Sequence, residues 1–415
     1  MYDIMILLPE RLDILRSLKS SDIPIDREEY SVYFKNIIYP YSDEYDIVVD
    51  CPYGRNYGNC WRLDSFPDES TFEMAVKVYA PYGKLLAQKS TTVHLYDKKS
   101  YDNITLLCIG DSMTRSEVYI SQAANKMPNV TTVGTRAIRL NVNHEGRGGW
   151  KSSDYLAEYY DRGKGVSPFL FPVNCSGEEY FGDKVFFERL ESDEYKNGYF
   201  YCGSRAEKIA DGMYCVDEGK LYKYENGNYT LTDENPQFEF SFGKYLERNG
   251  IAPPDIVSLL FGANDVQLTA YEDAEKAVEE FISNMRKIVS AIKSAHSRVK
   301  LVVSMPVCGA EQYAWGKQLG CRGSAKRYEY LIKLVGRAIL KEFDQRRDEN
   351  IYVCPMLAVC DPEFGFAKET VTANLYSESL VGHQNNWVHP NEAGYKQMGD
   401  ALAGTLAAVR NIQEK

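Results

Sequence analysis

Three short segments of the sequence carry side chains that could together perform acyl transfer. Ser112, in the run Gly110–Arg115, offers a hydroxyl that becomes a nucleophile once a base removes its proton. Asn264, in Gly262–Asp265, offers an uncharged amide that can donate hydrogen bonds to a developing oxyanion. His389 offers an imidazole that can act as a general base near neutral pH. Along the chain the order is nucleophile, oxyanion donor and base.

Each segment taken alone also has an ordinary structural explanation. A serine in this position can cap a helix, and an asparagine can occupy a turn or a helix cap. A lone histidine is more often structural, although the chain has only five. For Ser112 the two explanations are balanced, and for Asn264 alone the structural one is favoured. All three together, each expected at the end of a strand, favour a catalytic site.

The surrounding pattern is that of an α/β fold. Short apolar runs at 106–109, 255–261 and 300–305 are typical of parallel strands that are buried on both faces. Apolar residues recur every three or four positions over 274–292 and 328–339, which indicates amphipathic helices. Such alternation predicts a parallel sheet covered on both sides, and these sheets bind ligands at the carboxyl ends of their strands.

The remaining parts of the chain follow other patterns. Residues 1–100 predict a small antiparallel, sandwich-like β domain, because no helix-length apolar stripe interrupts the strand signals. Alternation of apolar and polar residues marks four strands there, at 32–38, 46–49, 72–79 and 91–95. The Tyr-rich, acidic stretch at about 160–236 has no strong period and predicts an insertion with short strands of its own. A last helix is expected over 392–409.

The three polar segments resemble the signature blocks of the SGNH (GDSL) hydrolase superfamily. The resemblance is carried by Gly110-Asp111-Ser112, by Gly262-Ala263-Asn264-Asp265 and by Val388-His389-Pro390-Asn391. It covers about residues 104–160 and 238–410. It implies a flavodoxin-like, three-layer α/β/α fold over 101–415, with the insertion left unexplained.

The resemblance also implies roles for individual residues. Ser112 attacks an ester carbonyl, and His389 takes its proton and later returns one to the leaving alcohol. The oxyanion is held by the backbone N–H of Ser112, the side chain of Asn264 and the backbone N–H of Gly149, with Gly148 as the rival for the last position. Asp111 is expected to be structural rather than catalytic.

A small β domain before the hydrolase domain, with the string His144-Glu145-Gly146-Arg147-Gly148-Gly149-Trp150, resembles bacterial carbohydrate acetylesterases. On that resemblance the substrate is an acetylated, plant-type oligo- or polysaccharide, and no metal or organic cofactor is expected. Trp150 and Trp387 are the expected substrate-binding side chains.

One position departs from the family pattern. The family has Asp-x-x-His, whereas this chain has Asn386 three residues before His389. An amide brings no negative charge to the imidazole. This position has four possible explanations. The enzyme works with a Ser–His pair alone, or a carboxylate from another part of the chain takes the place of the family Asp. Otherwise the residue was changed deliberately, or the chain has lost much of its activity.

The composition narrows the classes of partner. Lys and Arg total 48 against 59 Asp and Glu, a net charge of −11 that disfavours nucleic acid. No apolar run reaches the roughly 18–20 residues needed to cross a bilayer. The ten cysteines lack zinc-site spacing and suggest free thiols. The first residues do not resemble a signal peptide, so we expect a cytoplasmic protein, with a trimmed secreted chain as the alternative.

The leading hypothesis is therefore a serine esterase that deacetylates carbohydrates. One alternative is a short-chain lipid or thioester hydrolase, which uses the same chemistry on another substrate. The other is a carbohydrate-binding homologue that is catalytically weakened because Asn386 replaces the family Asp.

Overall fold

The central sheet of the molecule is parallel and has the predicted α/β form. The structure is a computed structural model, and it describes residues 4–16, 28–98, 103–127, 129–157, 167–183 and 209–411. The main strands are β10 (Ile104–Gly110), β11 (Val130–Val133), β19 (Ile256–Leu260), β20 (Lys300–Ser304) and β21 (Ile351–Cys354). Their spatial order is β11-β10-β19-β20-β21, with the short β12 (Glu145–Gly146) beside the end of β10. This order is the flavodoxin-like one, which confirms the predicted fold class.

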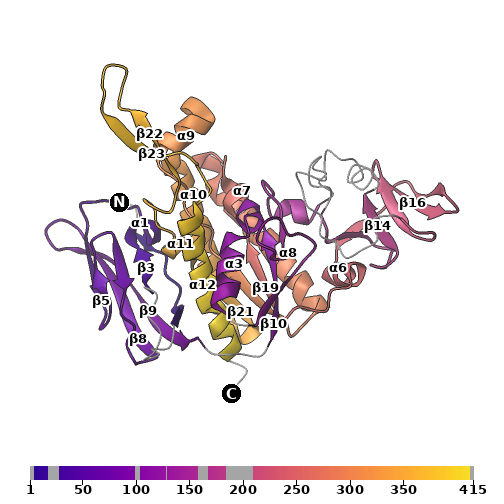
Figure 1. The fold of residues 1–415 in the computed structure, drawn as a ribbon, viewed down its shortest axis with the longest axis horizontal. Coiled ribbons are helices and arrows are strands. Elements are labelled where there is room, and N and C mark those ends of the chain that lie inside the picture. The colour runs from indigo at the N-terminus through magenta and orange to yellow at the C-terminus, as the bar shows by residue number, and fades with distance from the viewer. Residues whose placement is uncertain are drawn as a thin grey trace.

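Helices cover both faces of this sheet, as right-handed crossovers between parallel strands require. Helices α3 (Val118–Lys126) and α12 (Glu392–Asn411) pack side by side on one face (Figure 1). Helices α8 (Ala274–Ala295) and α10 (Ala325–Phe343) pack together as the other pair. Every apolar residue that defined the predicted stripe of α8 is buried, so the sequence period located the buried face correctly.

The N-terminal region forms a separate group of strands at one end of the molecule (Figure 1). One sheet has the order β2-β9-β8-β5 and another the order β3-β7-β6, with a two-stranded β1-β4 pair beside them. The bounds are β1 Met5–Ile6, β2 Arg11–Arg16, β3 Tyr30–Tyr33, β4 Ile38–Tyr39, β5 Asp46–Asp50, β6 Arg55–Asn56, β7 Cys60–Leu63, β8 Thr71–Tyr79 and β9 Leu85–Asp97.

Two details of this region differ from the prediction. β2 and β9 pair in parallel, so the sheet is mixed rather than wholly antiparallel. The expected strand at 32–38 is divided between β3, the one-turn helix α1 (Phe34–Ile37) and β4. Phe34 and Ile37 are both buried, and one helical turn buries residues three apart as effectively as a strand buries alternate ones.

The N-terminal region is fixed to the central domain by close packing and buried charges. A side chain at Gly404 of α12 would place its Cβ 2.1 Å from the carbonyl oxygen of Asp13, so only glycine fits this contact. The buried Asp13 carboxylate pairs with Arg347, at 2.8 Å. Lys333 of α10 is buried and donates to the carbonyl of Lys35, at 2.6 Å.

The stretch between β12 and β19 contains a small sheet of its own. Strands β14 (Tyr180–Asp183), β15 (Tyr214–Asp217), β16 (Lys220–Glu225) and β17 (Asn228–Asp233) lie in that order. A second pair joins β13 (Leu170–Pro172) to β18 (Phe238–Phe240), ahead of α6 (Phe242–Asn249). In Figure 1 this sheet lies at the end of the molecule opposite the N-terminal region. Residues 160–166 and 184–208 of the predicted insertion lie outside the described residues.

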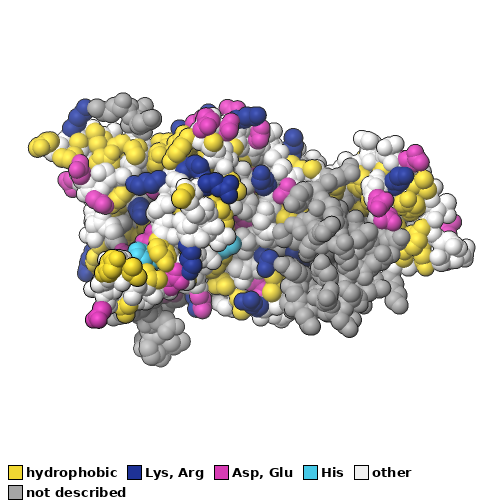
Figure 2. Space-filling model, turned by 90° about the horizontal axis from the view of Figure 1, so that it is seen from above, with side chains coloured by type: hydrophobic (Ala, Val, Ile, Leu, Met, Phe, Trp, Pro, Cys, Tyr) yellow, Lys and Arg dark blue, Asp and Glu magenta, His cyan; other side chains and the backbone are white. Residues whose placement is uncertain are grey.

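A hairpin that was not predicted projects beside the segment that carries His389. It consists of β22 (Lys368–Thr372) and β23 (Leu380–Gln384), and it lies beside α9 (Gln312–Leu319). Its connecting residues are largely exposed, with Tyr376 at 92%. Figure 2 views this end of the molecule, where hydrophobic side chains are exposed among Lys and Arg side chains.

Candidate active site

Ser112 lies where β10 gives way to the one-turn helix α2 (Ser112–Arg115). Asp111 caps this turn, because its Oδ1 accepts a hydrogen bond from the backbone N–H of Met113 at 2.8 Å. The turn is tight: a Cβ on Gly110 would lie 2.3 Å from Thr114 Oγ1. Burial raises the pKa of Asp111 to about 7. Through its bond to Met113, Asp111 shapes the turn that presents Ser112.

His389 is brought to Ser112 from a position 277 residues away. It follows the hairpin and precedes α12, and its Nε2 lies 2.8 Å from Ser112 Oγ. Burial, and next the positive charge of Arg115, lower the pKa of His389. A lowered pKa keeps the imidazole neutral near pH 7, which is the form that accepts a proton. The pair has the geometry expected of a nucleophile and its base.

Asn386 contacts the backbone of the histidine segment. Its Oδ1 accepts hydrogen bonds from the backbone N–H groups of His389, at 3.0 Å, and Val388, at 3.4 Å. This bond pattern closes the turn that carries the histidine. Among the described residues, no carboxylate forms a hydrogen bond with the His389 ring. The position that holds the acid in the family therefore shapes the loop here and brings no charge to the imidazole.

Asn264 lies at the start of the short helix α7 (Ala263–Val266). Its Nδ2 donates to the carbonyl of Trp150 at 3.0 Å and lies 3.4 Å from Asp111 Oδ2. The amide thus joins the Ser112 turn to the glycine-containing turn that ends at Trp150. Asp265 stabilises the segment that carries Asn264, because its Oδ2 accepts a hydrogen bond from the backbone N–H of Gly262 at 3.2 Å.

The two glycines proposed for the oxyanion hole lie in one tight turn. The N–H of Trp150 donates to the carbonyl of Arg147 at 3.3 Å, which closes the turn around Gly148 and Gly149. Gly149 has φ of +80°, a conformation that favours glycine, and it is exposed. A Cβ on Gly148 would lie 3.6 Å from the Cβ of Ser112. Both glycines therefore remain candidates for the backbone donor.

A buried ionic network that sequence reasoning missed lies beneath this turn. Arg147 pairs with Glu145 at 2.8 Å, and the hydroxyl of Tyr245 donates to the same carboxylate at 2.7 Å. The Tyr155 hydroxyl lies 2.7 Å from the Glu145 carbonyl and 2.8 Å from the Gly110 carbonyl. The only sequence signal was the charged string at 144–150, whose partners are up to 100 residues distant.

The two tryptophans have different surroundings. Trp150 is fully buried, with its ring edge-on to Tyr155 at 4.9 Å and within 5.2 Å of the Arg147 guanidinium. The prediction that the Trp150 side chain binds substrate is therefore wrong, because its ring fills the core below the turn. Trp387 is partly exposed and packs edge-on against Trp315 at 4.8 Å. It remains a candidate for substrate contact.

Metal-holding groups and membrane-spanning helices are two further features to consider in the described residues. Over these residues, no group of three or more His, Cys, Asp or Glu is placed to hold a metal ion. None of the described helices combines the length and apolar character needed to span a bilayer. The nine described cysteines are all free thiols.

Comparison with known proteins gives one family match. Residues 106–402 match the family described as GDSL-like lipase/acylhydrolase. No curated protein matches significantly. Similar solved structures include a carbohydrate esterase family 3 protein from Talaromyces cellulolyticus, 12% identical, which covers 74% of this chain and 99% of its own with a TM-score of 0.36. A family 3 carbohydrate esterase from Clostridium thermocellum is 12% identical, and the match covers 75% of this chain and 99% of the esterase with a TM-score of 0.34. A possible lipase from Chitinophaga pinensis is 12% identical, and the match covers 75% of this chain and 100% of the lipase with a TM-score of 0.34.

Proposed function

The chain belongs to the GDSL-like lipase/acylhydrolase family, and from that premise we propose that it removes O-acetyl groups from plant-type oligo- or polysaccharides. The family makes it a carboxylic ester hydrolase. The observation that carries the proposed mechanism is the 2.8 Å contact between Ser112 Oγ and His389 Nε2, with the Asn264 amide beside the same turn. A nucleophile, a base and an uncharged donor together suit ester hydrolysis.

In the proposed reaction, Ser112 Oγ attacks the acetyl carbonyl carbon while its proton passes to His389 Nε2. The resulting oxyanion is stabilised by the N–H of Ser112, the N–H of Gly149 or Gly148, and the amide of Asn264. Collapse breaks the bond to the sugar oxygen, which takes the proton from His389. Water then attacks the acetyl group through the same base, which releases acetate and restores Ser112.

The surroundings of Asn386 support a second reading, a catalytically weakened carbohydrate-binding homologue. With no carboxylate on the imidazole ring among the described residues, the imidazolium formed during attack lacks one stabilising charge. In a serine protease, an Asp-to-Asn change at the equivalent role costs about 10⁴ in kcat. The oxyanion donors and the bound substrate still supply a residual rate of roughly 10³–10⁴ over water.

The test of the proposed function uses acetylated xylan, mannan and xyloglucan fragments. Incubation with the protein should remove acetyl groups, seen by mass spectrometry as losses of one acetyl mass each, and Ser112→Ala should abolish the change. A rate on p-nitrophenyl esters that rises steadily from acetate to octanoate would instead indicate a lipid or thioester hydrolase. Binding of the fragments without any deacetylation would establish the weakened homologue.

A further inference from the structure

The segment that carries His389 rests on a neighbouring loop, residues 361–365, which we call the supporting loop. The backbone N–H of Asn391, two residues after the histidine, donates to the carbonyl of Gly365 at 2.8 Å. The Asn391 side chain adds a second bond, from its Nδ2 to the carbonyl of Phe364, also at 2.8 Å. Both bonds join the histidine segment to the supporting loop immediately before α12 begins.

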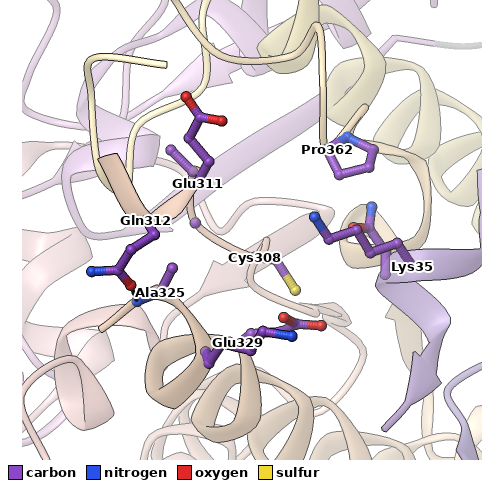
Figure 3. Close-up of a pocket in the computed structure, with 11 residues that line it drawn as sticks. Lys35, Cys308, Glu311, Gln312, Ala325, Glu329 and Pro362 are labelled. Atoms are coloured by element: carbon purple, nitrogen blue, oxygen red, sulfur yellow. Dashed lines mark hydrogen bonds between the residues drawn. The ribbon is translucent and has the colours of Figure 1, made fainter. Parts of the chain in front are cut away.

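The supporting loop also holds the chain on the other side of the histidine. The buried Gln384, at the end of β23, donates through its Nε2 to the carbonyls of Pro362, at 2.9 Å, and Glu363, at 3.0 Å. Pro362 also lines a small cavity beside the N-terminal region, where Figure 3 shows it on the same side as Lys35 of α1. The supporting loop thus borders both the histidine segment and the N-terminal region.

Asp361 shapes the supporting loop from within. Its Oδ1 accepts hydrogen bonds from the backbone N–H groups of Glu363, at 2.8 Å, and Phe364, at 3.0 Å. Its own carbonyl accepts from the N–H of Gly365 at 3.0 Å, and a Cβ on Gly365 would lie 2.4 Å from that carbonyl oxygen. Because the loop closes around this one residue, a shift of Asp361 moves the carbonyls that Asn391 binds.

The second oxygen of the Asp361 carboxylate is held by the N-terminal region. The hydroxyl of Tyr33, a buried residue of β3, donates to Asp361 Oδ2 at 2.9 Å. Burial, and next the charge of Asp361, raise the pKa of Tyr33, so its hydroxyl stays protonated and remains a donor. Gln397 of α12 completes the set, because its Nε2 donates to the Tyr33 oxygen at 3.3 Å and its Oε1 accepts from the Asp361 N–H at 2.8 Å.

Asn36 of α1 provides a second bond from the same region. It is buried, and its Nδ2 donates to the carbonyl of Cys360, the residue before the supporting loop, at 2.7 Å. A buried polar group that loses its partner costs free energy, so Tyr33 and Asn36 both favour one position of the loop. Two side chains of the N-terminal region therefore fix the start of the loop on which the histidine segment rests.

We propose that the N-terminal region positions the general base, through the bond from Tyr33 to Asp361 and the bonds from the supporting loop to the His389 segment. Tyr33 and Asp361 are positioning residues, since they act through the loop and not on the substrate. The proposal rests on the proposed function for the reaction that it serves, whereas the bonds are independent of the substrate. Because His389 serves both formation and hydrolysis of the acyl-enzyme, a displaced loop lowers kcat for any ester that the enzyme accepts.

Tyr33→Phe tests the first bond by removing one hydroxyl and keeping the ring. With each variant assayed well below its thermal midpoint, kcat on p-nitrophenyl acetate should fall about fivefold, the equivalent of one typical hydrogen bond, and KM should not change. Tyr30→Phe is the matched control, because Tyr30 is a buried residue of the same strand whose hydroxyl forms no hydrogen bond within the described residues. Wild-type kcat in Tyr33→Phe, or an equal fall in Tyr30→Phe, would overturn the proposal.

A double-mutant cycle separates positioning from a general loss of stability. Asn391→Ser keeps an oxygen for the N–H of Gly394 at the start of α12 and removes the amide that binds the Phe364 carbonyl. If the effect of Tyr33 passes through the supporting loop to Asn391, adding Tyr33→Phe to Asn391→Ser should lower kcat less than about twofold further. A further fall as large as in the unaltered background would show that Tyr33 does not act through this contact.

Hydrogen–deuterium exchange tests the positioning without using activity. In Tyr33→Phe the peptide that spans residues 384–391 should exchange faster than in the unaltered protein, while the core strand β20 keeps its rate, and Tyr30→Phe should change neither. Faster exchange in that peptide, together with no deacetylation of oligosaccharides, would refute the proposed function and uphold the positioning. Unchanged exchange in that peptide would refute the positioning, whatever the substrate.

Discussion

At the scale of single residues, catalysis depends on how well the His389 imidazole accepts and holds the proton of Ser112. The two atoms lie 2.8 Å apart, which is a good hydrogen-bonding distance. Burial and the charge of Arg115 both favour the neutral ring. Each therefore helps the histidine to be a base and hinders the positive charge it must carry after proton transfer. A carboxylate at position 386 would stabilise the positive charge that the ring carries after proton transfer.

We predict that Asn386→Asp increases kcat on p-nitrophenyl acetate by tenfold or more. The substitution keeps an oxygen for the backbone N–H of His389, 3.0 Å away, and adds a negative charge near the ring. The upper limit is the roughly 10⁴, about 5.5 kcal/mol, that the opposite change costs a serine protease. Asn386→Ala is the control and should lower kcat, because it removes the turn-closing bond. An unchanged rate in Asn386→Asp would mean that another group already orients His389.

We also predict a shift in the acid limb of the pH profile of kcat/KM when Arg115 loses its charge. The limb reports the pKa of His389 in the free enzyme, and protonated His389 cannot accept the Ser112 proton. Arg115 lowers that pKa, so Arg115→Met should raise it and move the limb to higher pH. The variant then loses activity on acidification before the unaltered enzyme does. Arg298→Met, an exposed residue, should leave the limb in place, and a limb that stays put in both variants would contradict the assigned role of Arg115.

At the scale of elements, the site is formed by four turns that follow strands or precede helices. The turn around Gly148 and Gly149 is held from below by the Glu145–Arg147 ion pair and by Tyr155. Tyr155 also hydrogen bonds to the carbonyl of Gly110, the last residue of β10. One hydroxyl therefore connects the strand that presents Ser112 to the segment that presents the oxyanion donors.

Tyr155→Phe should reduce both stability and kcat. The substitution removes the hydroxyl that bonds to the Gly110 and Glu145 carbonyls, and the loss of one such hydrogen bond costs about 0.5–1.5 kcal/mol of unfolding free energy. It also frees the glycine-containing turn relative to Ser112, so we expect kcat on p-nitrophenyl acetate to fall more than KM changes. Urea denaturation and steady-state kinetics measure the two effects. Tyr376→Phe, at a side chain 92% exposed, should change neither quantity. Wild-type values of both in Tyr155→Phe would exclude this supporting role.

The elements also show what the sequence could and could not predict. The strand at 104–110 and the helix at 274–295 were predictable, because a buried parallel strand reads as an apolar run and an amphipathic helix as a stripe. The division of the segment at 32–38 could not be predicted, because a single helical turn is too short to produce a helical repeat of apolar residues. The Ser112–His389 pairing followed from the family blocks. The network around Glu145 depends on Tyr245, 100 residues away, and no local pattern encodes such a contact.

At the scale of the whole molecule, the N-terminal region and the central domain behave as one packed unit. They share the buried Asp13–Arg347 pair and the Lys333 contact with the Lys35 carbonyl. The two parts also share hydrophobic packing, since buried residues of both regions belong to one core cluster. Loss of packing at this boundary should therefore destabilise the entire chain.

Gly404→Ala tests the boundary directly. The added Cβ would lie 2.1 Å from the carbonyl oxygen of Asp13, so α12 or β2 must move. Overpacking of this kind costs typically about 1–3 kcal/mol. We expect a lower thermal midpoint and a single transition in calorimetry. Gly382→Ala, where nothing lies within 4 Å of the added Cβ, should leave the midpoint unchanged. Separate transitions, or an unchanged midpoint in Gly404→Ala, would show that the two parts unfold independently.

The most direct test of the account is the site at which a serine-directed p-nitrophenyl phosphonate attaches. The reagent mimics the ester, and its phosphorus is attacked only by a hydroxyl whose proton a neighbouring base can take. Peptide mass spectrometry of the labelled protein should find one adduct per chain, on Ser112, formed in step with the loss of esterase activity. Loss of activity with the adduct on any other residue would contradict the assignment of Ser112 and His389 as the catalytic pair.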